Sequence, residues 1–191
     1  MSLVIQTLEK IEKWLKLNQP SVASFPYPGL TNKQIEELTK NLSFKLPKEV
    51  QELYQWHNGT RHGHGFFPFH VFYSLEECLG FNSNIIDYWD DAQSMSLHTL
   101  ILFSIDKSFF FTVSSCEEQE LSPIWVMHMG DEPVVCFESL TNLLLMISDC
   151  YETGAYYVDN KGYLEEDTAK SNLIFSRYNP DIKNRPDLGI Y

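Results

Sequence analysis

Apolar positions in the N-terminal part of the chain recur at helical spacing. From Val4 to Leu15 an apolar residue returns every three or four positions behind Ser2, which predicts an amphipathic helix that ends before Pro20. The next stretch, 19–30, contains three prolines and a glycine. We therefore expect an irregular connector there rather than a helix or strand.

Two more helices are predicted directly after the connector. Thr31 and Gln34 form a T-x-x-Q capping box, and the apolar positions of 35–42 give this helix one buried face. Pro47 suits the first position of the next helix, because its missing N–H would have no intrahelical partner there. The Asn-Gly pair at 58–59 is expected to end that helix, since both residues tolerate the left-handed backbone of a C-terminal cap.

The middle of the chain changes to strand-like patterns. The aromatic run 66–73 is β-prone and leads into a second capping box, formed by Ser74 and Glu77, which predicts a short helix. Four further β-prone runs predict two hairpins in one antiparallel sheet, each joined across a short polar turn. These runs are 99–105 and 109–114 in the first hairpin, and 123–129 and 133–139 in the second.

Two helices are predicted after the hairpins. Ser139 can cap a helix that covers the sheet with its apolar face and runs to about Thr153, before Gly154. A shorter helix is expected within 164–180, where Pro180 prevents its continuation. Helices grouped before and after a block of hairpins indicate an α+β fold, with a mostly antiparallel central sheet of hairpins flanked by N-terminal and C-terminal helices.

Length, composition and charge narrow the class of protein. The 191 residues suit a single domain over 1–191, and 43% hydrophobic residues are typical of a folded chain. The formal charge of −12 argues against a nucleic-acid surface, which needs clustered cations, and against binding to anionic membranes. An acidic protein attracts basic proteins if its carboxylates gather on one face. The alternative is that the charge only aids solubility.

The cysteines and the N-terminus indicate a cytoplasmic protein. The four cysteines are far apart, form no C-x-x-C pair and lie mostly among apolar neighbours, as buried free thiols do; they are Cys78, Cys116, Cys136 and Cys150. The first residues lack a basic start followed by an apolar run, and no stretch approaches the roughly 20 apolar residues of a membrane span. We therefore expect a reducing cytoplasm as its location.

Candidate chemistry is sparse. A histidine-rich region contains His57, His62, His64 and His70, and its H-x-H pattern suits a transition metal. The alternative is a turn-rich loop, because no cysteine or acidic residue lies among these histidines and the glycines there are typical of turns. His128 and Asp131 suggest an acid–base pair, but they lie near a strand end where side chains seldom converge. Nucleophile-elbow, phosphate-loop and dinucleotide motifs do not occur. We predict no catalytic, metal-binding or cofactor-binding residues.

Two acidic groups and one tryptophan are the candidate partner-binding residues. Carboxylates that flank an aromatic anchor can compete for a cationic cleft, whereas the alternative is a solvated acidic surface. Trp56 lies at a predicted helix end, where it serves either as an interface residue or as a cover for the core. The first acidic group is Asp87, Tyr88, Trp89, Asp90 and Asp91, and the second is Glu117, Glu118 and Glu120.

Several ordered motifs resemble the SMI1/KNR4 family of the SUKH superfamily. The chain has Leu46-Pro47 at a helix start, then an aromatic "NG" end that contains Tyr54 and the triplet 57–59. It also has "FYSLEECL" at 72–79, like the strand-to-helix step of the family, and "VVCFESLTNLLLMI" at 134–147, like its closing strand and helix. Two departures are the turn at Asp106-Lys107, where relatives often carry glycines, and Leu140, where they carry phenylalanine.

The resemblance covers about residues 31–153 and implies both a fold and a class of function. It implies helices around a mostly antiparallel sheet, with the N-terminal helix and a C-terminal extension outside this core. It also implies a non-catalytic protein-binding domain, most readily an immunity protein that neutralises a bacterial polymorphic toxin, such as a nuclease, by binding a basic toxin domain. The alternatives are a regulatory scaffold without a toxin partner and an unrecognised small-molecule or metal-binding enzyme. The oligomeric state stays open.

Overall fold

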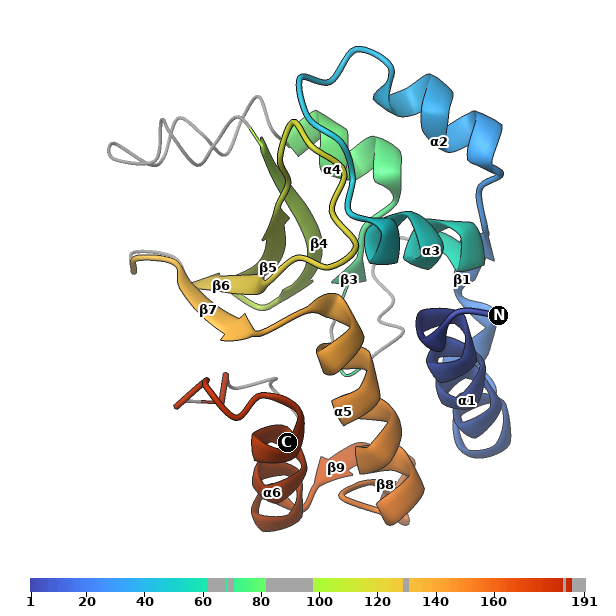
Figure 1. The fold of residues 1–191 in the computed structure, drawn as a ribbon. Helices are drawn as coiled ribbons and strands as arrows, with labels where there is room; N and C mark the ends of the chain where they lie inside the picture. Colours follow the sequence, from blue (N-terminus) through green and yellow to red (C-terminus); the bar gives the residue numbers. More distant parts are fainter. Residues whose placement is uncertain (62–67, 69–70, 82–97, 129–130, 184, 187–191) are drawn as a thin grey trace.

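The computed structural model describes residues 1–61, 68, 71–81, 98–128, 131–183 and 185–186 (Figure 1). Within these residues the predicted α+β fold is confirmed, with helices before and after an antiparallel sheet. The helices are α1 (Leu3–Asn18), α2 (Asn32–Thr39), α3 (Lys48–Trp56), α4 (Leu75–Phe81), α5 (Leu140–Thr153) and α6 (Thr168–Tyr178), with a 3₁₀ turn at Val22–Ser24.

The central sheet has the strand order β3-β4-β5-β6-β7, and every neighbouring pair is antiparallel. Both predicted hairpins are present. The first turn is only two residues long, because Ser108 already pairs with Ile105, and Asp106 takes a positive φ of 46° there. The strands are β3 (Val71–Phe72), β4 (Thr99–Ile105), β5 (Ser108–Val113), β6 (Ile124–His128) and β7 (Val134–Phe137).

The main core lies between the sheet and the helices. The predicted apolar stripes are buried in α1, α3 and α5, and they meet Leu100, Leu102 and Phe110 from the sheet. The rings of Trp14 in α1 and Tyr151 in α5 stack at 4.1 Å between centroids. A second cluster of Ile101, Phe111 and Met127 occupies the other side of the sheet; these residues alternate with the main-core residues along the strands.

The connector prediction is wrong in part, because β1 (Pro26–Pro28) pairs with β2 (His57–Thr60). The expected role of the Asn-Gly pair is also wrong, since α3 ends at Trp56 and the next residue is already extended. Asn58 instead accepts a hydrogen bond from the Leu75 N–H at 2.9 Å. Gly59 has φ +78°, and a Cβ there would lie 2.4 Å from the Ser74 nitrogen. The pair therefore permits a close approach to the start of α4.

A third hairpin was missed in the C-terminal part of the chain. β8 (Tyr156–Val158) pairs with β9 (Leu164–Glu166), so only the part of 164–180 after Asp167 is helical. Three-residue strands are too short to show a period-two pattern. In Figure 1 this hairpin lies at the end of α5 that is distant from the central sheet, while α6 runs beside α5 and its last residue, Tyr178, accepts a hydrogen bond from Asn142 in the first turn of α5.

Candidate protein-binding groove

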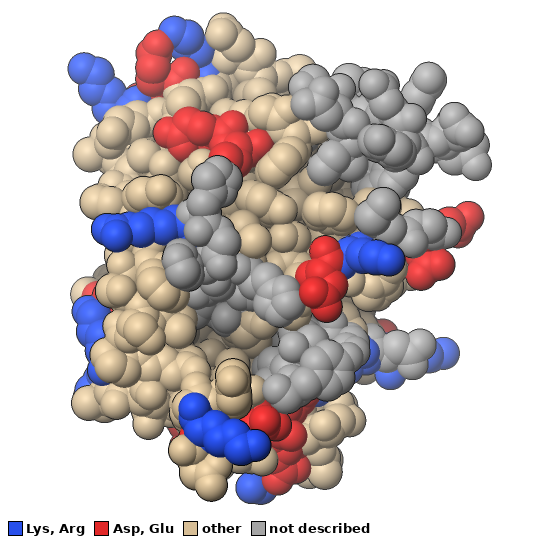
Figure 2. All heavy atoms as spheres, turned by 180° about the vertical axis from the view of Figure 1, so that it is seen from behind, with Lys and Arg blue, Asp and Glu red and all other residues tan. Residues whose placement is uncertain are grey.

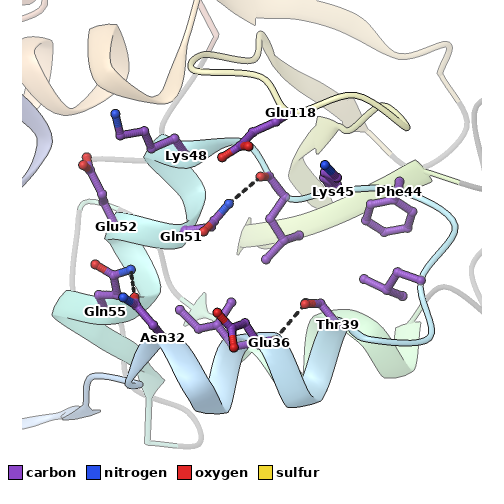
Figure 3. Close-up of a pocket in the computed structure, with 13 residues that line it drawn as sticks. Asn32, Glu36, Thr39, Phe44, Lys45, Lys48, Gln51, Glu52, Gln55 and Glu118 are labelled. Carbon is purple, nitrogen blue, oxygen red and sulfur yellow. Dashed lines mark hydrogen bonds between the residues drawn. The ribbon is translucent and has the colours of Figure 1, made fainter.

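A groove with a volume of about 710 Å³ lies between α2, α3 and the segment 44–46 (Figure 3). Each helix contributes four positions at the spacing i, i+3, i+4 and i+7, so one face of each helix forms a wall. The α3 wall consists of Lys48, Gln51, Glu52 and Gln55, and the α2 wall consists of Asn32, Ile35, Glu36 and Thr39. We call this feature the α2–α3 groove.

The start of α2 is fixed against the end of α3. The Leu30 N–H donates to the Tyr54 carbonyl at 2.8 Å, and the Asn32 and Gln55 side chains are hydrogen-bonded at 2.6 Å (Figure 3). Gly29 permits this approach, because a Cβ at that position would lie 1.9 Å from the Gln55 carbonyl oxygen. The predicted capping box of Thr31 and Gln34 is present and starts the helix. The two walls therefore join at this end.

The floor of the groove is apolar and its rim is polar. Ile35, Phe44 and Leu46 line the groove but belong to the main core and are buried. Gln51 donates from its amide to the Leu46 carbonyl at 2.9 Å, which holds the floor to the α3 wall. The side chains that a partner meets first are therefore the amides and charges of the rim.

Two residues of the second predicted acidic group, Glu118 and Glu120, lie at this rim. Glu117, Glu118 and Glu120 are exposed, and Glu118 lines the groove. Their backbone is held by the first turn of α3, where the Lys48 N–H donates to the Gln119 carbonyl at 2.8 Å and the Glu49 N–H to the Glu120 carbonyl at 3.3 Å. These contacts satisfy N–H groups that a helix start leaves without an intrahelical acceptor. The structure thus brings together residues about seventy positions apart in the chain.

Carboxylates outnumber cations at the rim. Lys48 Nζ lies 3.0 Å from Glu120 Oε2, and this hydrogen bond and charge, together with Glu52 and Glu118, raise the pKa of the Lys48 amine. The rim carboxylates are Glu36, Glu52 and Glu118, which line the groove, and Glu120, which pairs with Lys48; the rim amines are Lys45 and Lys48. Four negative and two positive groups give a local charge of −2. On the face shown in Figure 2, charges of both signs are scattered among neutral residues.

Trp56 is half-buried at the end of α3, packs against the main core and does not line the groove. The first acidic group, Asp87 to Asp91, lies outside the described residues. Among the predicted contact residues that the structure describes, those of the second acidic group adjoin the groove.

Of the four histidines in the histidine-rich region, the structure describes His57. His57 is half-buried, and its Nδ1 lies 2.8 Å from the Tyr27 carbonyl oxygen, so the neutral ring donates its Nδ1–H to that oxygen and links β2 to β1. His62, His64 and His70 lie outside the described residues. In the described part of the chain, no three His, Cys, Asp or Glu residues are grouped to hold a metal ion.

His57 should make stability depend on pH. Burial, more than any other cause, lowers the pKa of His57, so its neutral form stabilises the fold above the unfolded pKa of about 6.5. This contribution is lost as the pH falls through the lower folded pKa. We expect the urea midpoint of the wild type to decline more between about pH 8 and pH 5 than that of His57→Gln, which keeps an amide donor without the titration. Parallel declines would contradict this assignment.

The side chain of His128 contacts a serine. Its Nδ1 lies 2.5 Å from Ser108 Oγ, and these two residues are directly paired between β5 and β6. Asp131 meets His128 through the backbone, where its N–H donates to the His128 carbonyl at 3.0 Å. The contact with Ser108 is a cross-strand pair of a kind common in sheets.

Sequence reasoning missed Glu49, the residue that fixes the α3 wall. Glu49 is 2% exposed, and it accepts hydrogen bonds from the Ser122, Leu140 and Thr141 N–H groups and from the Thr141 hydroxyl at 2.7–3.1 Å. Burial raises the pKa of Glu49, and these hydrogen bonds offset part of that rise. Its position four residues before the buried Leu53 places it on the apolar face of α3, which was the available signal.

The comparisons with known proteins agree with the predicted family. The model of the SMI1 / KNR4 family (SUKH-1) matches residues 29–146, a span that contains the entire α2–α3 groove. No curated protein matches the chain. A membrane-crossing helix, long and apolar enough for the purpose, is not found among the described residues. The match covers more than half of the chain, and the chain therefore belongs to the SMI1/KNR4 family (SUKH-1).

Proposed function

We propose that this chain is a cytoplasmic immunity protein that neutralises a bacterial toxin by binding a basic surface of the toxin domain. Membership of the SMI1/KNR4 family is consistent with an immunity-type protein-binding domain. The observation that carries the proposal is the α2–α3 groove, whose rim has a local charge of −2. Such a rim repels polyanions and attracts a cationic protein surface. The toxin is blocked by occlusion rather than by a reaction.

The ionisable groups support binding rather than chemistry. Catalytic groups are usually desolvated and aimed into a cleft, whereas Lys48 and Glu120 at the rim have side chains that are 52% and 77% exposed. The buried ionisable groups Tyr54 and Cys78 contact each other within the core. Tyr54 and Cys78 are hydrogen-bonded at 3.0 Å, and burial raises the pKa of both.

The cysteines support the proposed location. All four are free, and Cys78, Cys136 and Cys150 are buried. Burial raises the pKa of Cys150 to about 12, so this thiol stays protonated and unreactive at neutral pH. A chain whose four thiols are unpaired, three of them buried, suits a reducing compartment.

Two further regions are proposed as secondary contacts. Trp56 presents part of an indole at the end of α3, and the sequence of Asp87 to Asp91 combines three carboxylates with Tyr88 and Trp89. Charge reversal at Asp90 and Asp91 should slow association with a basic toxin at low salt. An unchanged association rate would remove this region from the proposed surface.

Co-expression tests the proposed function directly. The partner to test is the C-terminal domain of a large secreted protein encoded beside the gene for this chain. Expression of the chain should restore growth of cells that produce that domain, and the two proteins should purify together. The triple variant Glu117→Gln, Glu118→Gln, Glu120→Gln should weaken rescue, because it removes two of the four rim carboxylates and the neighbouring charge of Glu117. Absence of both rescue and a complex would refute the immunity function.

A further inference from the structure

Lys48 lies at the rim of the groove, on the α3 wall. It is the first residue of α3, its side chain pairs with Glu120 at 3.0 Å, and Glu52 and Glu118 also act on its charge. Its amine is thus in contact with one carboxylate and within the influence of two more. A fourth, Glu36, comes from the opposite wall on α2 (Figure 3).

The Lys48–Glu120 pair is suited to exchange. Both side chains are more than half exposed, and exposed ion pairs contribute only about 0.2–1 kcal/mol. A guanidinium group offers five donors in a planar fork and pairs with carboxylates through two hydrogen bonds, whereas the lysine amine acts as a point charge. An arriving arginine therefore gains more at these carboxylates than Lys48 loses.

We propose that Lys48 is an internal stand-in for a basic side chain of the partner, and that an arginine-bearing extended segment displaces it when it enters the α2–α3 groove. The proposal rests on the proposed function for the identity of the partner as a protein. The amides of Gln51, Gln55 and Asn32 line the walls but are hydrogen-bonded within the protein, so recognition of the segment falls to the rim carboxylates. The displaced Lys48 side chain turns to solvent and leaves Glu52, Glu118 and Glu120 to the incoming arginine.

The experiment measures binding of a fluorescein-labelled nonapeptide of alternating arginine and glycine by fluorescence anisotropy at low and physiological salt. Lys48→Gln should bind it about threefold more tightly than the wild type, because an exposed competing cation is removed. Lys33→Gln is the matched control, because Lys33 is exposed like Lys48 but lies on α2 and does not line the groove. This variant makes the same change in net charge, and it should alter the affinity less than Lys48→Gln does.

Removal of the acceptors gives the opposite expected effect. Glu52→Gln, Glu118→Gln should weaken binding of the peptide about tenfold, since two charge-assisted contacts are lost. The control pair Glu9→Gln, Glu132→Gln lies outside the groove and is exposed, so it should weaken binding much less. Equal effects of Lys48→Gln and Lys33→Gln, or of the two double variants, would overturn the proposal and leave only an effect of net charge.

The results also separate this inference from the proposed function. If the variants change peptide affinity as expected but no toxin is neutralised, the groove binds basic segments and the immunity function fails. The opposite result is also informative. If the wild type, the Lys48→Gln variant and the double variant of Glu52 and Glu118 all neutralise a toxin equally well, the immunity function stands and the role of the groove fails. Circular dichroism spectra that match the wild type show that the variants are folded.

Discussion

Replacement of Glu49 by alanine should lower the free energy of unfolding by about 3–5 kcal/mol, because each buried donor left without an acceptor costs about 1–3 kcal/mol and the loss of the buried carboxylate offsets part of that sum. The carboxylate is 2% exposed and joins the first turn of α5 to α3 and to Ser122. Without it, three backbone N–H groups and the Thr141 hydroxyl lose their acceptor in the core, and alanine leaves a cavity as well. Urea unfolding followed by tryptophan fluorescence measures the loss.

Two variants show whether the acceptor or the packing matters. Glu49→Gln keeps the shape and one acceptor oxygen, so its effect should be about half that of Glu49→Ala, within the same range of costs for unsatisfied buried groups. Glu52→Ala, on the exposed side of the same helix, should change stability by no more than about 0.5 kcal/mol. If Glu49→Ala were as mild as Glu52→Ala, the carboxylate would not be the link between α3 and α5.

Glu49 also connects the core to the groove. Ser122, whose N–H it holds at 2.8 Å, follows the acidic segment 117–120 by two residues, and the Glu49 N–H holds the Glu120 carbonyl at the other side of the same peptide stretch. The carboxylate therefore fixes both the α3 wall and the rim. A preformed rim binds without the cost of ordering its side chains and backbone.

The sequence predicts those parts of the fold in which local chemistry and burial act together. The capping boxes at Thr31 and Ser74 give hydrogen bonds between neighbours in the chain, so they can be recognised without tertiary information. The long runs of β4 and β5 are buried on both faces and form a hairpin across a short turn. In these elements local preference and tertiary packing favour the same structure.

Elements that depend on distant contacts could not be predicted in the same way. The strands β1 and β2 are short, and two of the three β1 residues are prolines that lack a donor, so only the pairing with each other identifies them as strands. The sequence of the Asn-Gly pair fits a helix end as well as a close approach, because a cap and a close approach require the same backbone freedom. Only the position of Ser74 beside Gly59 distinguishes them.

The candidate site was predictable in its chemistry but not in its shape. Glu117, Glu118 and Glu120 are recognisable as an acidic group, yet their neighbours Glu52 and Lys48 come from a helix about seventy residues earlier. The groove depends on the separation of α2 from α3, which Gly29 and Leu30 set through contacts with Tyr54 and Gln55. Spacing within one helix gives its faces, but the distance between two helices follows only from the tertiary structure.

The other large effect is expected at Arg185, in the C-terminal extension outside the family match. Its guanidinium pairs with Glu166 at 2.5 Å and donates to the Tyr156 hydroxyl at 2.9 Å, and the side chains of Arg185 and Glu166 are each only 10% exposed. Arg185→Met should therefore lower the free energy of unfolding by about 3–5 kcal/mol, because it leaves a buried carboxylate without its cation. Urea unfolding gives this value.

Matched variants distinguish the buried pair from arginine in general. Arg177 pairs with Asp149 at 3.1 Å but its side chain is 63% exposed, so Arg177→Met should cost no more than about 1 kcal/mol. The double variant Arg185→Met, Glu166→Leu should recover most of the loss, since no buried charge remains. Because this cluster lies apart from the residues that line the groove, folded Arg185→Met should bind the arginine peptide like the wild type. A loss of peptide affinity in the folded variant would instead show that the extension and the groove are coupled.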